Sequence, residues 1–189
     1  MSLHALTGCD TTSSLKGIGK VKPIKLFQKS DKFGEILCQL GETWDLEETQ
    51  LKDIEHFVCC LYGFQRFKSI DQVRVHILRK KCEKNGVLDP KKNIDLANLP
   101  PCFSSLKQHI KQVNYQVRIW KLAEENFPER PQPTNHGWKL TEMGLEPLWS
   151  EGNILPTQLV DLLEDVVVSD TDEEDNKYES DSSDISDIV

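Results

Sequence analysis

The chain has 189 residues and a formal net charge of −8, which allows one folded domain and a tail. Residues 161–189 hold 12 acidic residues and one basic residue, whereas residues 1–160 hold 19 acidic and 22 basic residues. No apolar run reaches the roughly 20 residues of a membrane helix, and no secretory signal begins the chain. We therefore expect an intracellular protein with no membrane role, a mildly basic folded part and an acidic disordered tail.

Apolar residues at helical spacing predict a mainly α fold. A short helix is expected over residues 23–29, and a second apolar stripe covers residues 33–40 and ends at Gly41. The clearest pattern spans residues 47–62, where acidic residues in the first turn and the terminal Gly63 suit the two ends of a helix.

Two further helices are predicted in the second half of the folded part. Asp71 is placed to cap the first, whose basic end at residues 79–81 suits a helix C-terminus. Asn-Gly, Asp-Pro and Pro-Pro pairs predict a loop over residues 85–101. A long helix follows, with the apolar stripe Leu106, Ile110, Val113, Val117 and Trp120. Its lysines are expected to be solvated, with a basic DNA-facing surface as the alternative.

These patterns divide the chain into three parts. Residues 1–125 are expected to form a helical, bundle-like body. Residues 126–160 contain five prolines, which argue against long helices and predict an irregular segment. Trp138 and Trp149 are expected to dock this segment onto the helical body or a partner. A final short helix is expected near residues 155–163, and residues 161–189 are too charged to fold alone.

The cysteines and histidines predict no catalytic or zinc site. No pair of the six cysteines has the C-x-x-C spacing of a zinc site, so reduced and mostly buried thiols are expected. The five histidines are scattered without a cysteine or serine partner at an interpretable spacing. We therefore expect them to be structural or surface residues.

Residues 4–20 are the most informative stretch. Gly8, Cys9 and Asp10 form a tight turn that presents a carboxylate, and a Leu-x-Gly-Ile-Gly run follows at residues 15–19. Gly17 and Gly19 permit unusual backbone angles and close approach, and a hairpin leading into a helix N-terminus directs amides at an anion. The surrounding lysines are Lys16, Lys20, Lys22, Lys25 and Lys29. The alternative is a simple turn between two helices, because Gly-x-Gly alone is a weak signal.

These motifs resemble the flap endonuclease family of PIN-like nucleases over about the first forty residues. Leu-x-Gly-Ile-Gly with its following helix resembles a helix-hairpin-helix, here over about residues 8–29. The resemblance implies that Asp10 is a vestigial ligand of a divalent metal. It also implies a monovalent cation such as K⁺ at Ser14, Leu15 and Ile18. The implied nucleic-acid-binding residues are Lys16, Gly17, Gly19, Lys20, Lys22 and Lys25.

A second resemblance extends to about Trp149. Residues 4–27 are similar to the HALTGCDTTS segment of uncharacterised, multi-copy animal proteins that look transposon-associated. Residues 138–149 fit a W-x-x-T-x-x-G…P-x-W run of the same proteins. In those proteins a PIN-like half precedes this segment. The resemblance therefore implies that this chain is the helical C-terminal half of a nuclease-like protein.

The number of carboxylates argues against catalysis by this chain. Two-metal nucleases need several carboxylates around ions roughly 4 Å apart, and the family draws most of them from strands that precede its Gly-x-Asp. Only nine residues precede Asp10 here. We expect no catalytic residues, with Mg²⁺ or Mn²⁺ bound only if an upstream catalytic half completes the site.

The main functional hypothesis is a non-catalytic, sequence-tolerant, nuclear nucleic-acid-binding remnant of a mobile-element nuclease that contacts the DNA backbone. The first alternative is a protein-interaction module without nucleic-acid binding. The second is a fragment of an active metal-dependent nuclease.

The tail contains a short β-prone run followed by acids, which resembles a SUMO-interacting motif. The partner-binding residues would be Val166, Val167, Val168, Asp170 and Asp172, with the valines adding a strand to the partner's sheet. Ser169 and Thr171 each precede an acid by three residues, and their phosphorylation would add negative charge beside a basic groove. The alternative is that the valines end the preceding helix and pack on the body.

Overall fold

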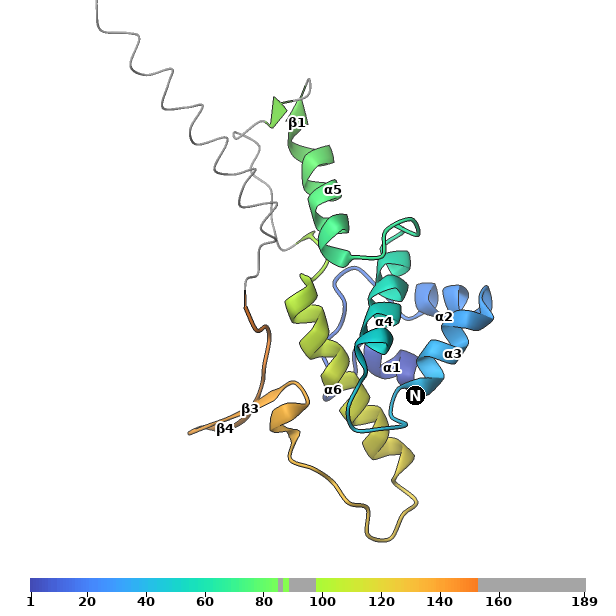
Figure 1. Ribbon diagram of the computed structural model, residues 1–189, viewed down its shortest axis with the longest axis vertical. Coiled ribbons are helices and arrows are strands. Elements are labelled where there is room, and N and C mark those ends of the chain that lie inside the picture. The colour runs from blue at the N-terminus through green and yellow to red at the C-terminus, as the bar shows by residue number, and fades with distance from the viewer. Residues whose placement is uncertain (85–86, 89–97, 153–189) are drawn as a thin grey trace, which may run out of the picture.

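The computed structural model describes residues 1–84, 87–88 and 98–152. The described part is mainly helical, as predicted, with six α-helices and two small antiparallel hairpins (Figure 1). None of the helices described here has the length and apolar character needed to cross a membrane. The expected helix at residues 155–163 and the acidic tail lie outside the described residues.

The six helices lie within the first 121 residues. They are α1 (Ser2–Leu6), α2 (Val21–Gln28), α3 (Asp31–Gln39), α4 (Glu48–Leu61), α5 (Ile70–Cys82) and α6 (Phe103–Lys121). The short strands β1 (Glu83–Lys84) and β2 (Val87–Leu88) pair beyond α5. After α6 come the 3₁₀-helix η2 (Pro133–Asn135) and the strands β3 (Trp138–Thr141) and β4 (Gly144–Pro147).

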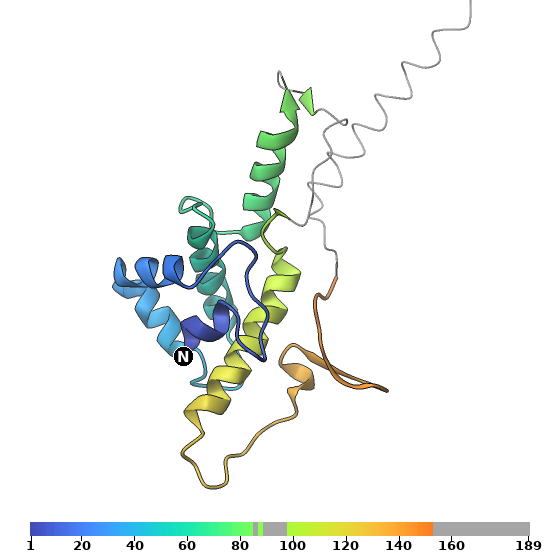
Figure 2. The ribbon, with the colours of Figure 1, turned by 180° about the vertical axis from the view of Figure 1, so that it is seen from behind.

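The core lies where α1 and α4 pack against α6 and α3 packs against α1 and α4, while α5 extends away from this body (Figures 1 and 2). The predicted α6 stripe is confirmed, because Leu106, Ile110, Val113 and Val117 are fully buried. Trp120 is partly buried against the same core. The apolar spacing that predicted the helix therefore also selects the face that is removed from water.

Local signals fix the ends of α3 and α4. At the start of α4, the backbone amide of Glu47 donates to Oε1 of Gln50 at 2.9 Å in a capping box. Gly63 follows the helix with φ of +91°, a conformation that favours glycine. Gly41 follows α3 with φ of +76°, and a Cβ there would lie 2.7 Å from Cγ1 of Val117. Both glycines expected to end helices are therefore confirmed.

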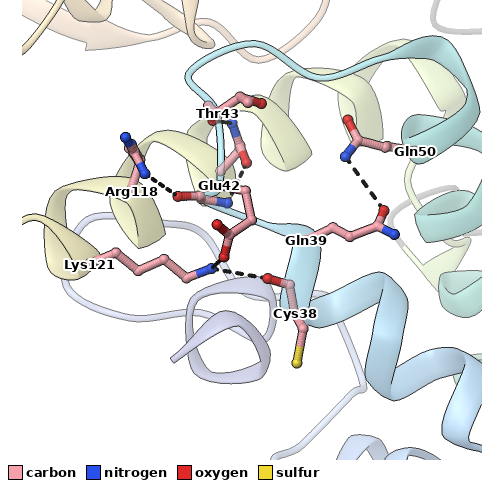
Figure 3. A network of polar contacts seen from close by, with 9 residues as sticks. Cys38, Gln39, Glu42, Thr43, Gln50, Arg118 and Lys121 are labelled. Carbon is pink, nitrogen blue, oxygen red and sulfur yellow. Dashed lines mark hydrogen bonds and ion pairs between the residues drawn. The ribbon is translucent and has the colours of Figure 1, made fainter.

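The chain after α3 is held by polar side chains of α6 (Figure 3). Oδ1 of Asn114 accepts the Gly41 amide at 2.7 Å, and its Nδ2 donates to the carbonyls of Thr43 and Trp44, each at 2.9 Å. Lys121 donates to the Cys38 carbonyl at 3.0 Å and pairs with Glu42 (Figure 3). The turn that leads to α4 is thereby fixed to the central helix.

Asp71 does not cap its own helix, contrary to the prediction. The helix α5 begins one residue earlier, at Ile70, and Asp71 lies in its first turn. Oδ1 of Asp71 accepts the Phe103 amide at 3.1 Å, at the start of α6. Oε1 of Glu55 on α4 accepts the Ile70 amide at 2.7 Å. A carboxylate from the preceding helix thus satisfies an amide at the start of each of these two helices.

Residues 126–152 are less irregular than predicted. β3 and β4 form an antiparallel hairpin in which Trp138 pairs with Pro147 and Thr141 pairs with Gly144. Gly144 has φ of +117°, and Pro147 lies at the strand end, where a proline is tolerated. The prolines exclude long helices but not this short hairpin. Likewise, β2 lies within the stretch predicted to be a loop, and it pairs with β1.

Candidate nucleic-acid interface

The sequence-predicted hairpin is a tight turn at residues 15–18. The Ile18 amide donates to the Leu15 carbonyl at 3.0 Å, and Gly17 has φ of +76° at the third position of the turn, which is typical of a type II turn. Leu15 and Ile18 are buried in the core. Lys16 and Gly17 are exposed between them. The turn is thus anchored by its two ends and presents its tip to solvent.

Tyr62 fixes the tip of this turn to the end of α4. Its hydroxyl donates to the Lys16 carbonyl at 3.1 Å, and burial raises the pKa of Tyr62 to about 12, so the donor stays protonated at neutral pH. The exposed Arg66 and Lys68 follow shortly after Tyr62. The structure therefore places two further cations in the loop that begins beside the hairpin.

The three glycines of this region have different roles. A Cβ at Gly17 or Gly19 would meet no heavy atom within 4 Å, so both positions face open space. Within the described part, the amides of both residues are without an acceptor. At Gly8, by contrast, a Cβ would lie 2.8 Å from Cβ of Ser14. Gly8 is therefore needed for packing, whereas the other two leave the backbone approachable.

A helix follows the turn, as predicted, but none directly precedes it. α1 ends at Leu6, and residues 7–20 form turns and extended chain. Thr12 Oγ1 donates to the Ala5 carbonyl at 2.7 Å, and the Cys9 amide donates to the Thr12 carbonyl at 3.1 Å. These contacts fold the chain back against the end of α1 in place of a further helical turn.

The lysines of the predicted site differ in their surroundings. Nζ of Lys20 donates to the His4 carbonyl at 3.0 Å and to the Gly8 carbonyl, so its charge satisfies acceptors at the end of α1. Lys16, Lys22 and Lys25 are exposed, and none forms an ion pair with a described residue. Lys20 is held by the protein itself, whereas the other three are available to a ligand.

The structure does not gather ligands around Asp10. Asp10 is exposed, and among the described residues no cluster of three or more His, Cys, Asp or Glu side chains is arranged to hold a metal ion. Of the residues implied for a monovalent cation, Leu15 and Ile18 form the two ends of the turn and Ser14 directly precedes it. Val166–Val168 and the neighbouring residues of the expected SUMO-interacting motif, including Asp170 and Asp172, lie outside the described residues, as do Ser169 and Thr171.

The thiol next to Asp10 is more acidic than an ordinary cysteine. Partial burial by itself raises the pKa of Cys9, but side-chain and backbone hydrogen bonds with Thr11 and Thr12 together outweigh this effect and lower it. The Thr12 contact is 3.1 Å and the Thr11 contact is 3.4 Å. Burial raises the pKa of Cys59 in α4 to about 12.

A groove that sequence reasoning missed runs beside the hairpin. Two cavities of about 270 and 460 Å³ share Ser13, Gln112 and Trp149 as lining residues. Lys16 lines the first cavity and Asp10 the second. The lining comes from the N-terminal loop, from α6 with the residues just before it, and from the β3–β4 segment with the chain that follows it. Its parts are distant in sequence, so no local pattern marked them as one site.

Buried polar contacts hold the floor of this groove. Burial lowers the pKa of His109, which favours the neutral ring. Its Nε2 donates to the Leu6 carbonyl at 2.9 Å, which leaves Nδ1 to accept the Ser13 hydroxyl at 3.1 Å. Nε2 of Gln112 donates to the Gly137 carbonyl at 2.6 Å. These bonds join α6 to the loop on one side and to the β3–β4 segment on the other.

Neither tryptophan is fully buried against the helical body, and docking of this segment on a partner stays a prediction. Trp138 is only partly buried, and 64% of the Trp149 surface is exposed. Docking instead uses Gly137, whose φ of +87° and lack of a side chain allow it to lie against the Gln108 carbonyl. A bond from Gln108 to Glu151 at 2.9 Å adds to this contact. Trp149 is left free at the rim of the groove.

Comparisons of the chain with protein-family models, with curated proteins and with solved structures each gave no match.

Proposed function

We propose that the chain is a non-catalytic nucleic-acid-binding module that contacts the phosphate backbone through the turn at residues 15–18 and the start of α2. The observation that carries this proposal is the exposed tip of the turn, where an open glycine backbone lies beside lysines that form no ion pair with a described residue. Amides at such a turn and at a helix N-terminus are suited to bind a phosphate oxygen. Backbone contacts of this kind carry no sequence information, so binding is sequence-tolerant.

The local charge supports this proposal. Residues 15–32 hold six lysines and one acid, Asp31. With Lys20 engaged at α1, contacts from Lys16, Lys22 and Lys25 to three phosphates would give a log–log salt slope of roughly −2.7. Raising the salt from about 50 to about 200 mM would then weaken binding roughly 40-fold. The proposed mode is therefore weak and strongly salt-dependent.

The test is charge reversal with a matched control. The hairpin variant carries Lys16→Glu, Lys22→Glu and Lys25→Glu. The control variant carries the same substitution at three exposed lysines on other elements, namely Lys52, Lys80 and Lys139. Fluorescence anisotropy with a labelled duplex in low salt should show more than a tenfold loss for the hairpin variant and a much smaller loss for the control. Equal losses in both variants, or no binding by the unaltered chain, would contradict the proposal.

Protein interaction is the second candidate, and the β3–β4 hairpin is the observation that favours it. The hairpin projects from the helical body (Figures 1 and 2), and Leu140, Met143 and Leu145 are exposed on it. Exposed apolar side chains gathered on one projecting element are typical of interaction surfaces. This candidate replaces the first if the chain binds neither DNA nor RNA in low salt, and if Leu140→Glu with Leu145→Glu abolishes recovery of a protein partner.

A further inference from the structure

Trp149 occupies an unusual position for a large aromatic residue. It lines both cavities of the groove, yet 64% of its surface is exposed. The described neighbours therefore leave much of the indole uncovered. A tryptophan in this position offers apolar, polarisable surface to a planar ligand.

The cavity beside the turn has the size and lining for one planar polar group. Its volume is about 270 Å³, just below the range of about 300–1,000 Å³ for small-molecule pockets. Leu15 and Leu148 contribute apolar surface, and Ser13, Ser14 and Gln112 contribute polar surface. Because Nε2 of Gln112 is engaged by Gly137, its oxygen is the acceptor left for a ligand.

The charges along the groove favour a ligand with an anionic end. Lys16 is the only charged side chain among the described residues that line the cavity beside the turn. Asp10 lines the neighbouring cavity on the far side of Ser13 and Trp149. An anion would therefore lie toward Lys16, and its uncharged part would extend past Trp149.

We propose that this groove binds an unpaired nucleotide of a single-stranded nucleic acid, with the base stacked on Trp149 and the adjoining phosphate at Lys16. The inference rests on the proposed function, because Lys16 is shared with the phosphate-binding turn. In a duplex the bases are already stacked on each other and do not reach the groove. The groove thus adds a preference for single strands to a surface that otherwise contacts only phosphates.

The decisive variant is Trp149→Ala, compared with Trp149→Phe and Phe127→Ala. Binding is measured by anisotropy in about 50 mM salt with a labelled oligo-dT of about 12 nucleotides and with a blunt duplex. Trp149→Ala should lose roughly 5- to 100-fold in oligo-dT affinity, with the duplex affinity unchanged. Trp149→Phe should keep most of the oligo-dT affinity, because the phenyl ring can still stack. Phe127 is exposed and lines neither cavity, so Phe127→Ala should have no effect.

The failures of the two proposals give different results. If the duplex binds and the lysine substitutions weaken it, but Trp149→Ala leaves the ratio of oligo-dT to duplex affinity unchanged, the groove proposal is wrong and the proposed function stands. If the lysine substitutions leave binding unchanged, the turn and the start of α2 do not bind phosphates, and the proposed function is wrong. If Trp149→Ala weakens only the recovery of a protein partner, the groove belongs to a protein interface and the nucleotide proposal is overturned.

Discussion

Replacing Asn114 by alanine should destabilise the fold strongly, because one buried side chain makes three hydrogen bonds to the chain after α3. Only 1% of Asn114 is exposed, and it bonds the amide of Gly41 and the carbonyls of Thr43 and Trp44. The variant leaves the buried Gly41 amide without this acceptor, at a cost of about 1–3 kcal/mol. The two carbonyls are nearer to solvent and add about 0.5–1.5 kcal/mol each. We expect a total loss of about 3 kcal/mol in the free energy of unfolding.

Urea unfolding followed by circular dichroism measures this loss through the midpoint and slope of the transition. In thermal unfolding the same loss corresponds to a fall in Tm of about 6–12 °C. The control is Asn135→Ala, because Asn135 is exposed in η2 and its loss should cost no more than about 0.5 kcal/mol. If the two variants unfold at the same urea concentration, the contacts of Asn114 do not hold the turn.

Three further outcomes follow from the geometry. Burial raises the pKa of Glu55 in the folded chain, despite the opposing bond from the Ile70 amide. The protonated carboxyl therefore stabilises the fold below the pKa of about 4.3 of the unfolded chain. This stabilisation is lost as the pH rises through the pKa of the folded chain. Glu55→Gln should flatten this pH dependence and stabilise the chain at pH 7. If the unfolding free energy of the two proteins has the same slope against pH, the upward shift of the Glu55 pKa is contradicted. Iodoacetamide at neutral pH should label the exposed Cys38 well before Cys59, which is buried with a pKa of about 12, and peptide mapping that finds equal rates would exclude the packing of α4. Gly137→Ala would place a Cβ 2.6 Å from the Gln108 carbonyl at a φ of +87°, so limited proteolysis should cut the β3–β4 segment sooner, and an unchanged cleavage rate would show that docking does not need this glycine.

Features set by neighbouring residues in the sequence were predictable. The helix expected over residues 47–62 is α4, Glu48–Leu61, because its apolar spacing, first turn and terminal glycine all act within one element. The tight turn at Gly17 was also readable, since few residues other than glycine adopt its positive φ. The mainly α character follows from the same local patterns.

Features set by contacts between distant residues were not predictable. Aspartate is a common N-cap residue, but the amide that bonds to Asp71 belongs to Phe103, 32 residues away. In the sequence, Lys20 cannot be told apart from the nearby lysines, and only the fold shows that its ammonium group is held at α1. The groove at Trp149 needs three separate segments, so its existence depends on the docking of Gly137 against α6.

The burial of α1 against α6 has a consequence for the order in which the chain matures. Leu6 is fully buried, and its carbonyl is bonded by His109, about 100 residues later. A ribosome adding roughly 5–20 residues per second needs roughly 5–20 s to cover that interval, and five residues are too few to hold a helix alone. The α1 segment must therefore wait, unprotected, until nearly the last part of the helical body has been translated. Nascent chains stalled before residue 103 should be cut by protease within residues 1–20, and protection there would rule out this order. Although α1 precedes the other helices of the body in the sequence, its buried surface is then among the last to be assembled.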